Sequence, residues 1–378
     1  MAVKVAFITV TLQHYRLSFY EKLSREKGFE IRVYHGVHQK NDGRPSYSGE
    51  VSFANEIFEE HKRQVGPFSV VENRGLMEKV RAFDPDIIVL PGIAGIVTNR
   101  RIASWAKRRQ KKLIIWSCGW EPGRAKGLLL AMKNHMVSRM FRKGDCHLTY
   151  STKASDYVES LGVAKGLITT CYNGIEIDDL LKNEKEIKQS AKKVREELKL
   201  DGKKTFIYVG GLIPEKRIDL LIAAFLQLRK KYDEIRLLII GDGPERADML
   251  KMLDAANDPN INWLGRIVDG VDAYFAAADC MVLPGIGGLA LNQAMIWGKP
   301  CIVSEADGTE DDLVIDGKTG FRFRAHKQES LQDAMVRYIS LSEEEKAVMS
   351  ESAREIILTK SNTNKMVEEF LAAFRRLV

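Results

Sequence analysis

Residues 206–225 read FIYVGGLIPEKRIDLLIAAF, and this stretch decides the fold. The apolar run over 206–209 has the composition of a buried strand, and it ends in two glycines. Over 218–230, apolar residues recur at helical spacing. A strand, a turn and a helix in this order are typical of a parallel sheet with crossover helices. The same order returns at once, with a strand predicted over 236–240 and a helix over 245–256.

The alternation of strand and helix continues through the rest of the chain. Toward the C-terminus, further strands are predicted over 260–264, 280–283 and 301–304. Upstream, strands are predicted over 3–9, 30–34, 87–90, 113–116 and 167–171. We therefore expect an α/β protein made of two Rossmann-like, doubly wound domains that face each other across a cleft.

A charged stretch separates the two halves. Residues 178–200 are rich in Lys and Glu, and they predict an exposed helix that follows a linker. The predicted domains are 1–172 and 173–360. The remaining segment, 361–378, is predicted to be a helix, because Val367, Phe370 and Phe374 share one of its faces. That apolar face should pack back toward the N-terminal domain.

Length and composition agree with two ordinary globular domains. The chain has 378 residues, of which 45% are hydrophobic and 29% charged, so extensive disorder is not expected. It contains no apolar run of about 18 residues, the minimum for a helix that spans a bilayer. The start of the sequence shows no cleavage-site pattern, which predicts an unprocessed, cytoplasmic protein. The five cysteines include no pair at CxxC spacing and predict neither a disulfide framework nor a zinc site.

The charge is distributed unevenly along the chain. Residues 1–170 carry 28 Lys and Arg against 16 Asp and Glu, whereas the remainder carries 30 against 35. A basic half favours an anionic partner, such as a phosphorylated acceptor or an anionic membrane leaflet. The alternative is a solvated basic surface. Nucleic acid is not expected as a partner, because no known reader module accompanies the charge.

Three turns after strands of the second half are candidate binding loops, because open parallel sheets bind ligands beyond the carboxyl ends of their strands. The first, Gly210 and Gly211 followed by Lys216 and Arg217, combines close backbone approach with two cations, which suits a phosphate. The alternative for both cations is ordinary surface charge. The second turn begins at Gly241, and a purely structural role is the favoured interpretation there.

The third turn contains three glycines just before a predicted helix. Gly285, Gly287 and Gly288 precede Leu289, where the helix is expected to begin. Backbone N–H groups at a helix start have no intrahelical partner, so such a loop can bind an anion. Here a binding role is favoured over a merely structural turn.

Together these segments resemble the donor-binding domain of family 4 retaining glycosyltransferases (glycosyl transferases group 1), which have the GT-B fold. The resemblance is carried by 206–225 and by LLIIGDGPE (237–245), INWLGRI (261–267), YFAAADCMVLP (274–284) and GLALNQAMIWGKPCIVSEADGTEDDLVIDGKTGF (288–321). Looser similarity extends to AFITVTLQHYRLSFYEKL (6–23), YSTKASDYVESLGV (150–163) and YNGIEI (172–177).

The resemblance implies transfer of a sugar from a nucleoside diphosphate sugar, held by domain 173–360, to an acceptor on domain 1–172. The expected acceptor is a saccharide or a lipid-linked molecule of bacterial surface-glycan assembly. The resemblance implies no cofactor, and the absence of an acidic pair at a strand end predicts a metal-independent mechanism. Lys216 occupies the position of a lysine that faces the diphosphate in this family. The donor-binding residues implied are Gly210, Gly211, Gly241, Arg266, Gly287, Gly288, Leu289 and Gln293.

The chain departs from the family pattern at several of these positions. The family usually has an arginine where Gly211 stands, and we expect Arg217, at a position that is usually glycine, to supply the missing charge. Two family glutamates, one facing the sugar and one the ribose, correspond to Gly285 and Gln293. A family histidine near the donor sugar corresponds to Cys118.

Candidate residues of the N-terminal domain lie in the loops after two predicted strands. His14, with Tyr15 and Arg16 beside it, follows the first strand, and Cys118 and Glu121 follow the fourth. His14 and Glu121 are candidate catalytic groups, whereas Tyr15, Arg16 and Cys118 are expected on the acceptor side. A solvated loop is the alternative for His14.

One further segment bears on location. A basic helical pattern over 124–142, with interleaved apolar residues, predicts either a peripheral membrane contact at the inner face of the membrane or a packed helix with a basic outer face. Two other functions stay open. One is a non-catalytic, glycosyltransferase-like partner protein, and the other is a sugar-nucleotide 2-epimerase.

Overall fold

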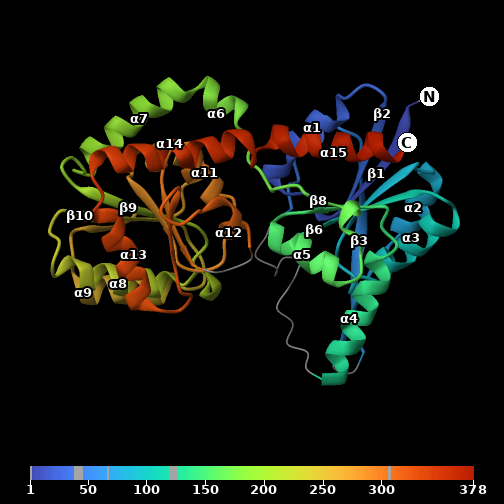
Figure 1. Cartoon of the computed structure of the whole chain (residues 1–378), viewed down its shortest axis with the longest axis horizontal. Helices are drawn as coiled ribbons and strands as arrows, with labels where there is room; N and C mark the ends of the chain where they lie inside the picture. The colour runs from blue at the N-terminus through green and yellow to red at the C-terminus, as the bar shows by residue number, and fades with distance from the viewer. Residues whose placement is uncertain (1, 38–45, 66–67, 120–126, 305–307) are drawn as a thin grey trace. The chain divides into compact units, whose positions relative to one another are not determined.

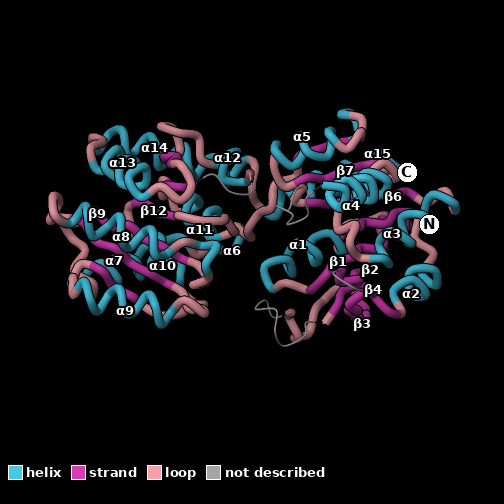
Figure 2. The backbone as a smooth tube through the Cα atoms, turned by 90° about the horizontal axis from the view of Figure 1, so that it is seen from below, coloured by secondary structure: helices cyan, strands magenta, loops and turns pink. Residues whose placement is uncertain are grey.

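The chain folds into two α/β units. The computed structural model describes residues 2–37, 46–65, 68–119, 127–304 and 308–378. Unit 1 consists of Met1–Tyr172 and Thr363–Val378, and unit 2 consists of Asn173–Asn362. Figure 2 shows strands between layers of helices in each unit. Within the described residues, no helix combines the length and the apolar character needed to cross a bilayer.

Unit 1 is built on an eight-stranded sheet with the order β4-β3-β2-β1-β5-β6-β7-β8. Its strands are β1 (Val3–Thr11), β2 (Phe29–Gly36), β3 (Asn55–Val65), β4 (Phe68–Arg74), β5 (Ile87–Pro91), β6 (Lys112–Ser117), β7 (Cys146–Thr149) and β8 (Ile168–Thr170). All neighbours are parallel except β3 and β4, which pair antiparallel at one edge. The predicted strands did not include this edge pair or β7. β3 is highly charged, so it lacks the apolar pattern of a buried strand.

The helices of unit 1 cover its sheet on both faces. They are α1 (Leu17–Ser24), α2 (Leu76–Phe83), α3 (Val97–Arg108), α4 (Gly127–Phe141), α5 (Thr152–Ser160) and α15 (Thr363–Leu377). The C-terminal α15 lies beside α1 (Figure 1). Its Phe370 side chain is completely buried, with its ring centroid 5.4 Å from that of Phe7 on the central strand β1. The prediction that the last helix packs on the N-terminal part of the chain is therefore confirmed.

Unit 2 is built on a six-stranded, fully parallel sheet with the order β11-β10-β9-β12-β13-β14. Its strands are β9 (Lys204–Val209), β10 (Ile235–Ile240), β11 (Ile261–Trp263), β12 (Cys280–Leu283), β13 (Cys301–Ser304) and β14 (Gly320–Phe323). Its helices are α6 (Asp178–Lys182), α7 (Glu184–Glu197), α8 (Ile218–Arg229), α9 (Arg246–Ala256), α10 (Val271–Ala277), α11 (Ala290–Ile296), α12 (Thr309–Leu313), α13 (Gln328–Ile339) and α14 (Glu343–Thr359).

The charged segment predicted as one exposed helix is in fact two helices, α6 and α7. Ala191 and Val194 of α7 are buried in the core of unit 2, where α7 packs against α10. The predicted exposed helix is therefore corrected in two respects: the segment forms two helices, and Ala191 and Val194, three positions apart, give α7 a narrow buried stripe among its charges.

The strand order of unit 2 defines where a ligand site belongs. From the central strand β9 the chain winds outward through β10 and β11, and it then crosses back to β12 on the other side of β9. The order therefore reverses between β9 and β12. In open α/β sheets, the carboxyl ends of the two strands at such a reversal flank the ligand-binding crevice.

Candidate functional site

The turns after β9 and β12 form one continuous structure at this reversal. The Ile286 amide donates to the Glu215 carbonyl over 3.0 Å. Lys216, at the end of the short 3-10 helix η3 (Pro214–Lys216), donates from Nζ to the Ile286 carbonyl oxygen over 2.7 Å and also to the Gly287 carbonyl. A Cβ on Gly285 would lie 2.0 Å from the Glu215 carbonyl oxygen, so only glycine allows this approach. The structure thus brings the first and third candidate turns together.

The turn after β10 packs against the turn after β9 through backbone alone. The Leu212 amide donates to the Asp242 carbonyl over 3.0 Å. A Cβ on Gly241 would lie 1.9 Å from the Gly210 carbonyl oxygen. The Gly241 carbonyl in turn accepts from the Trp263 indole over 3.0 Å. Gly241 is therefore required by contact between the two loops, which sequence spacing alone did not reveal.

Arg217 adopts a strained backbone and is engaged away from Lys216. Its φ of 53° lies in the left-handed region, which explains why glycine is usual at this position of the family. The guanidinium donates to Asp219, with an Nη2 to Oδ2 distance of 2.9 Å, and it contacts Nδ1 of His326. The hydrogen bond to Asp219 raises the pKa of Arg217. The expected phosphate role of Arg217 stays a prediction, and it requires the guanidinium to exchange these partners.

Gln293 is also engaged within the protein. It lies on α11, and its amide nitrogen donates to the Asp272 carboxylate over 3.1 Å. The Trp297 indole donates to the same oxygen over 2.7 Å. The Gln293 side chain is thereby oriented toward α10. To bind a ribose hydroxyl, Gln293 must use its side-chain carbonyl oxygen, or its amide nitrogen must leave Asp272. Arg266, in the turn after β11, is exposed, and Leu289 caps the start of α11.

A buried carboxylate belongs to the same edge and was missed at the sequence level. Glu310, in the first turn of α12, has no exposed surface. A Cβ on Gly287 would lie 1.8 Å from its Oε1 atom, so the Glu310 carboxylate lies directly against the loop that Lys216 binds. In the sequence Glu310 precedes Asp311 and Asp312 and looks like ordinary helix-start charge. No local signal distinguishes it from them.

In unit 1, the candidate residues lie at the carboxyl ends of β1 and β6. Arg16 is buried at the end of η1 (His14–Arg16), with its guanidinium 4.0 Å from the centre of the Trp116 ring. Its Nη2 donates to the Tyr150 hydroxyl over 3.0 Å, and burial raises the pKa of that hydroxyl. Its Nη1 is buried and makes no hydrogen bond with the described residues.

The remaining unit 1 candidates are more exposed than Arg16. His14 and Tyr15 are exposed, with their rings in edge contact at 5.6 Å. Cys118, just after β6, is exposed as well. Glu121 lies outside the described residues. In the part of the chain that the structure describes, no three His, Cys, Asp or Glu side chains gather as a metal site would require. The metal-independent mechanism stays a prediction.

Comparison with known proteins agrees with this architecture. Anabaena HepE in complex with UDP superposes with a TM-score of 0.74 over 100% of both chains, at 15% sequence identity. A crystal structure of HepE with UDP-glucose has a TM-score of 0.68. These similarities define the class of protein, which is a two-unit α/β protein of the GT-B fold, as predicted.

Sequence comparison then finds a family match within unit 2. Residues 189–356, all within unit 2, match the model for glycosyl transferases group 1. An uncharacterized glycosyltransferase of Methanocaldococcus jannaschii is 27% identical over 63% of this chain and 60% of its own length. The lipopolysaccharide 1,2-N-acetylglucosaminetransferase of Salmonella typhimurium is 27% identical over 43% of this chain and 46% of its own length. The match to the glycosyl transferases group 1 model thus covers a part of unit 2, and the chain spans less than two thirds of the length of these two relatives.

Proposed function

We propose that the protein is a retaining glycosyltransferase that moves a sugar from a nucleoside diphosphate sugar to a saccharide or lipid-linked acceptor. One observation carries the proposal. The Lys216 ammonium binds the glycine-rich loop at the point where the strand order of unit 2 reverses. Backbone amides next to a lysine ammonium suit the diphosphate of such a donor.

The proposed reaction depends on stabilising the leaving group. The acceptor oxygen bonds to the anomeric carbon on the face from which the diphosphate departs, while the bond from that carbon to the phosphate oxygen breaks. The acceptor proton passes to the departing phosphate. Lys216 and the backbone amides of 287–289 stabilise the charge that develops on that group. Preorganised donors of this kind contribute several kcal/mol. The same proposal needs no metal ion.

We propose a UDP-sugar as the donor to test first. The structures of HepE were solved with UDP and with UDP-glucose, and that protein shares the fold of this chain. The Salmonella relative is an N-acetylglucosaminetransferase of lipopolysaccharide, which supports a role in bacterial surface-glycan assembly. UDP-glucose and UDP-N-acetylglucosamine are therefore the first two donors to compare.

For the acceptor, we propose the edge of unit 1 that carries Arg16. The buried Nη1 atom has no hydrogen-bond partner among the described residues, and buried donors of this kind are normally satisfied. An acceptor hydroxyl or an anionic group would satisfy it. Tyr15, His14 and Cys118 lie near the same strand ends and are proposed to contact the acceptor.

A peripheral membrane contact is proposed for the basic segment 124–142. The structure confirms a helix over Gly127–Phe141, while residues 124–126 lie outside the described part. If the contact exists, anionic vesicles sediment the protein at low salt and release it at high salt. If the protein stays in the supernatant at low salt, the helix has no such role.

A second function is favoured by the internal contacts of two expected donor-site residues. Arg217 is bound to Asp219, and Gln293 is bound to Asp272. Together with Gly285 in place of a glutamate, these contacts are what a non-catalytic, glycosyltransferase-like partner protein would show. A sugar-nucleotide 2-epimerase is the third possibility. Epimerisation of a donor in the absence of acceptor would identify it.

The deciding experiment is thermal unfolding with UDP, GDP, ADP and dTDP. A ligand at about 100 times its dissociation constant adds roughly 2.7 kcal/mol of stability, which moves the midpoint by several degrees. We expect a shift with UDP in the wild type, a much smaller one in Lys216→Ala, and an unchanged one in Lys231→Ala, which alters an exposed lysine elsewhere in unit 2. If no nucleotide shifts the midpoint, the non-catalytic function is favoured.

A further inference from the structure

A cavity lies at the opposite end of the unit 2 sheet from the proposed donor site. Its volume is about 500 Å³, within the range of small-molecule sites. It is lined where β9 and β12 begin, by Lys204 and Asp279, and by residues of α7 and α14. Since β9 runs over six residues, from Lys204 to Val209, about 17 Å of strand separates the cavity from the turn that leads to Lys216.

The wall of this cavity is strongly cationic. Five basic side chains line it, and only two carboxylates do so, those of Asp279 and Glu343. The basic residues are Arg195, Lys203, Lys204, Lys299 and Lys346. Such a balance attracts anions.

Ion pairs offset some of these charges but not all. Arg195 pairs with Asp201 at 3.1 Å, and Lys346 pairs with Glu343 at 2.7 Å. Lys203 pairs with Glu234. Among the described residues, neither Lys204 nor Lys299 has a carboxylate oxygen within 4 Å of its ammonium. The Asp279 carboxylate, 3.9 Å from Arg195, raises the pKa of both lysines from farther away, so it offsets only part of their charge.

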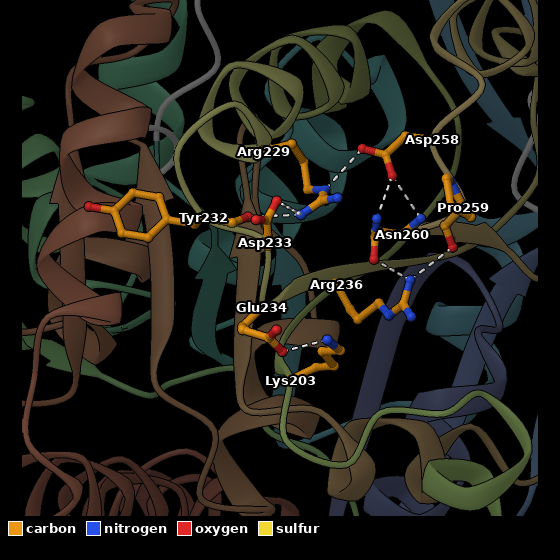
Figure 3. Close-up of polar contacts among 9 residues, drawn as sticks. All are labelled: Lys203, Arg229, Tyr232, Asp233, Glu234, Arg236, Asp258, Pro259 and Asn260. Atoms are coloured by element: carbon orange, nitrogen blue, oxygen red, sulfur yellow. Dashed lines mark hydrogen bonds and ion pairs between the residues drawn. The ribbon is translucent and has the colours of Figure 1, made fainter.

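Figure 3 shows the part of the same sheet edge next to the cavity, together with Lys203 of the cavity wall. There, Arg229 donates to Asp258 over 3.0 Å, and Glu234 faces Lys203. Arg229 and Lys203 thus each have a carboxylate in direct contact, whereas Lys204 and Lys299 do not.

Lys204 and Lys299 do have structural contacts. Lys204 donates to the Ile339 carbonyl over 3.0 Å, and Lys299 donates to the Ala276 carbonyl over 2.9 Å. Both carbonyls lie in the last turn of a helix, where cations are favourable. A capping role alone would explain these contacts. However, a neutral carbonyl does not compensate a charge, and each ammonium has three N–H donors.

The two lysines are also electrostatically strained. The neighbouring Lys346 side chain lowers the pKa of Lys204. Burial lowers the pKa of Lys299 to about 8. An anion between these groups would relieve both effects, because a nearby negative charge favours the protonated amine.

We propose that this cavity binds a phosphate-bearing small molecule at a site separate from the donor edge. A phosphate carries close to two negative charges near neutral pH, and it presents several oxygens to the ammonium groups of Lys204, Lys299 and Lys346. The cavity is larger than inorganic phosphate, so an organic phosphate such as a sugar phosphate fills it better. The site does not depend on the proposed transferase activity.

The test is thermal unfolding of the whole chain at pH 7 with inorganic phosphate and, separately, with a hexose 6-phosphate. Potassium chloride keeps the ionic strength constant. We expect a saturable rise of the midpoint, and a lower half-saturating concentration for the hexose phosphate. Lys204→Met should raise that concentration at least tenfold. Lys231→Met is the matched control, because it removes an exposed lysine that does not line the cavity, and it should leave the shift unchanged.

Two further variants keep the result interpretable. Ala347→Glu adds a carboxylate to the cavity wall at an exposed position of α14, removes no contact, and should also weaken binding. Lys216→Ala alters only the donor edge and should keep the phosphate shift. The proposal is overturned if no saturable shift occurs, or if Lys204→Met and Ala347→Glu respond like the wild type. It is equally overturned if Lys216→Ala alone abolishes the shift, because phosphate then binds the donor edge.

Discussion

At the scale of single residues, the proposed donor site depends on one lysine and the glycines around it. Lys216 binds the carbonyls of Ile286 and Gly287, so its ammonium is held at the loop by backbone that the strand order places there. Gly285 is needed because the Glu215 carbonyl of the facing turn comes too close for a Cβ, and Gly287 lies directly against the Glu310 carboxylate. The residues proposed to bind the donor are therefore also residues that hold the two turns together.

The first prediction concerns Lys216 itself. Lys216→Ala should lower turnover roughly a hundredfold or more, as expected when one preorganised donor to a developing charge is lost. The measurement is the rate of sugar transfer or donor hydrolysis at saturating donor. Lys231→Ala should keep wild-type turnover. If Lys216→Ala does the same, Lys216 does not stabilise the leaving group.

The second prediction concerns the glycine that lies against Glu310. Gly287→Ala should destabilise unit 2 by about 1–3 kcal/mol, the usual cost of overpacking, because the new methyl group meets the Glu310 carboxylate at 1.8 Å. Urea unfolding measures the change. Gly211→Ala is the matched control, since no atom lies within 4 Å of a Cβ there. The double variant Gly287→Ala with Glu310→Ala should recover part of the stability that Gly287→Ala loses, because the carboxylate that the new methyl group meets is removed. If Gly287→Ala and Gly211→Ala unfold with the same free energy, the packing of Gly287 against Glu310 is contradicted.

The third prediction concerns the charge of a buried histidine. His147, on β7, has no exposed surface, and burial lowers its pKa from 6.5 to about 4. The unfolded chain therefore binds this proton more readily, so His147 costs stability as the pH falls from about 6.5 to 4. His147→Leu should lose less stability than the wild type over this window, as measured by urea unfolding at each pH. Parallel pH profiles would show that His147 is not held neutral.

At the scale of secondary-structure elements, the helix α15 shows how a segment distant in sequence completes a core. Phe370 lies among Phe7, Phe19 and Trp116, with ring centroids 5.0–5.4 Å apart. The apolar face of this helix could be predicted from its own spacing. Its partners could not, because they belong to strands and helices more than 200 residues earlier.

The fourth prediction follows from this packing. Phe370→Ala should destabilise unit 1 by about 3–5 kcal/mol, the cost of removing a fully buried aromatic side chain. Denaturant unfolding measures it. Leu377→Ala, at the half-buried end of the same helix, should cost much less. Similar costs for the two variants would mean that α15 is not anchored through Phe370.

At the scale of the whole molecule, the chain consists of two units with separate hydrophobic cores. The core of unit 2 contains only residues between Ile177 and Ile357, and unit 1 has cores on the two faces of its sheet. A ligand of the donor edge should therefore stabilise unit 2 directly. In scanning calorimetry, UDP should raise the unfolding temperature of unit 2 and leave that of unit 1 unchanged. The transition of unit 2 is identified as the one that Gly287→Ala lowers.

The α/β class, the main strands of both sheets and the turns that carry Lys216 and the glycines could all be predicted from the amino-acid sequence. These features depend on residues within a few positions of one another, so local periodicity and composition predict them. The edge strand β3 escaped prediction because it is highly charged and lacks the apolar pattern of a buried strand.

The contacts between side chains that are distant in sequence became known only from the folded structure. It placed Glu310 against Gly287, turned Arg217 toward Asp219 and His326, and joined Gln293 to Asp272. It also gathered the cationic cavity from residues spread over 195–350. The physical reason is that burial and charge pairing depend on which elements the sheet order brings side by side, and no short stretch of sequence contains that information.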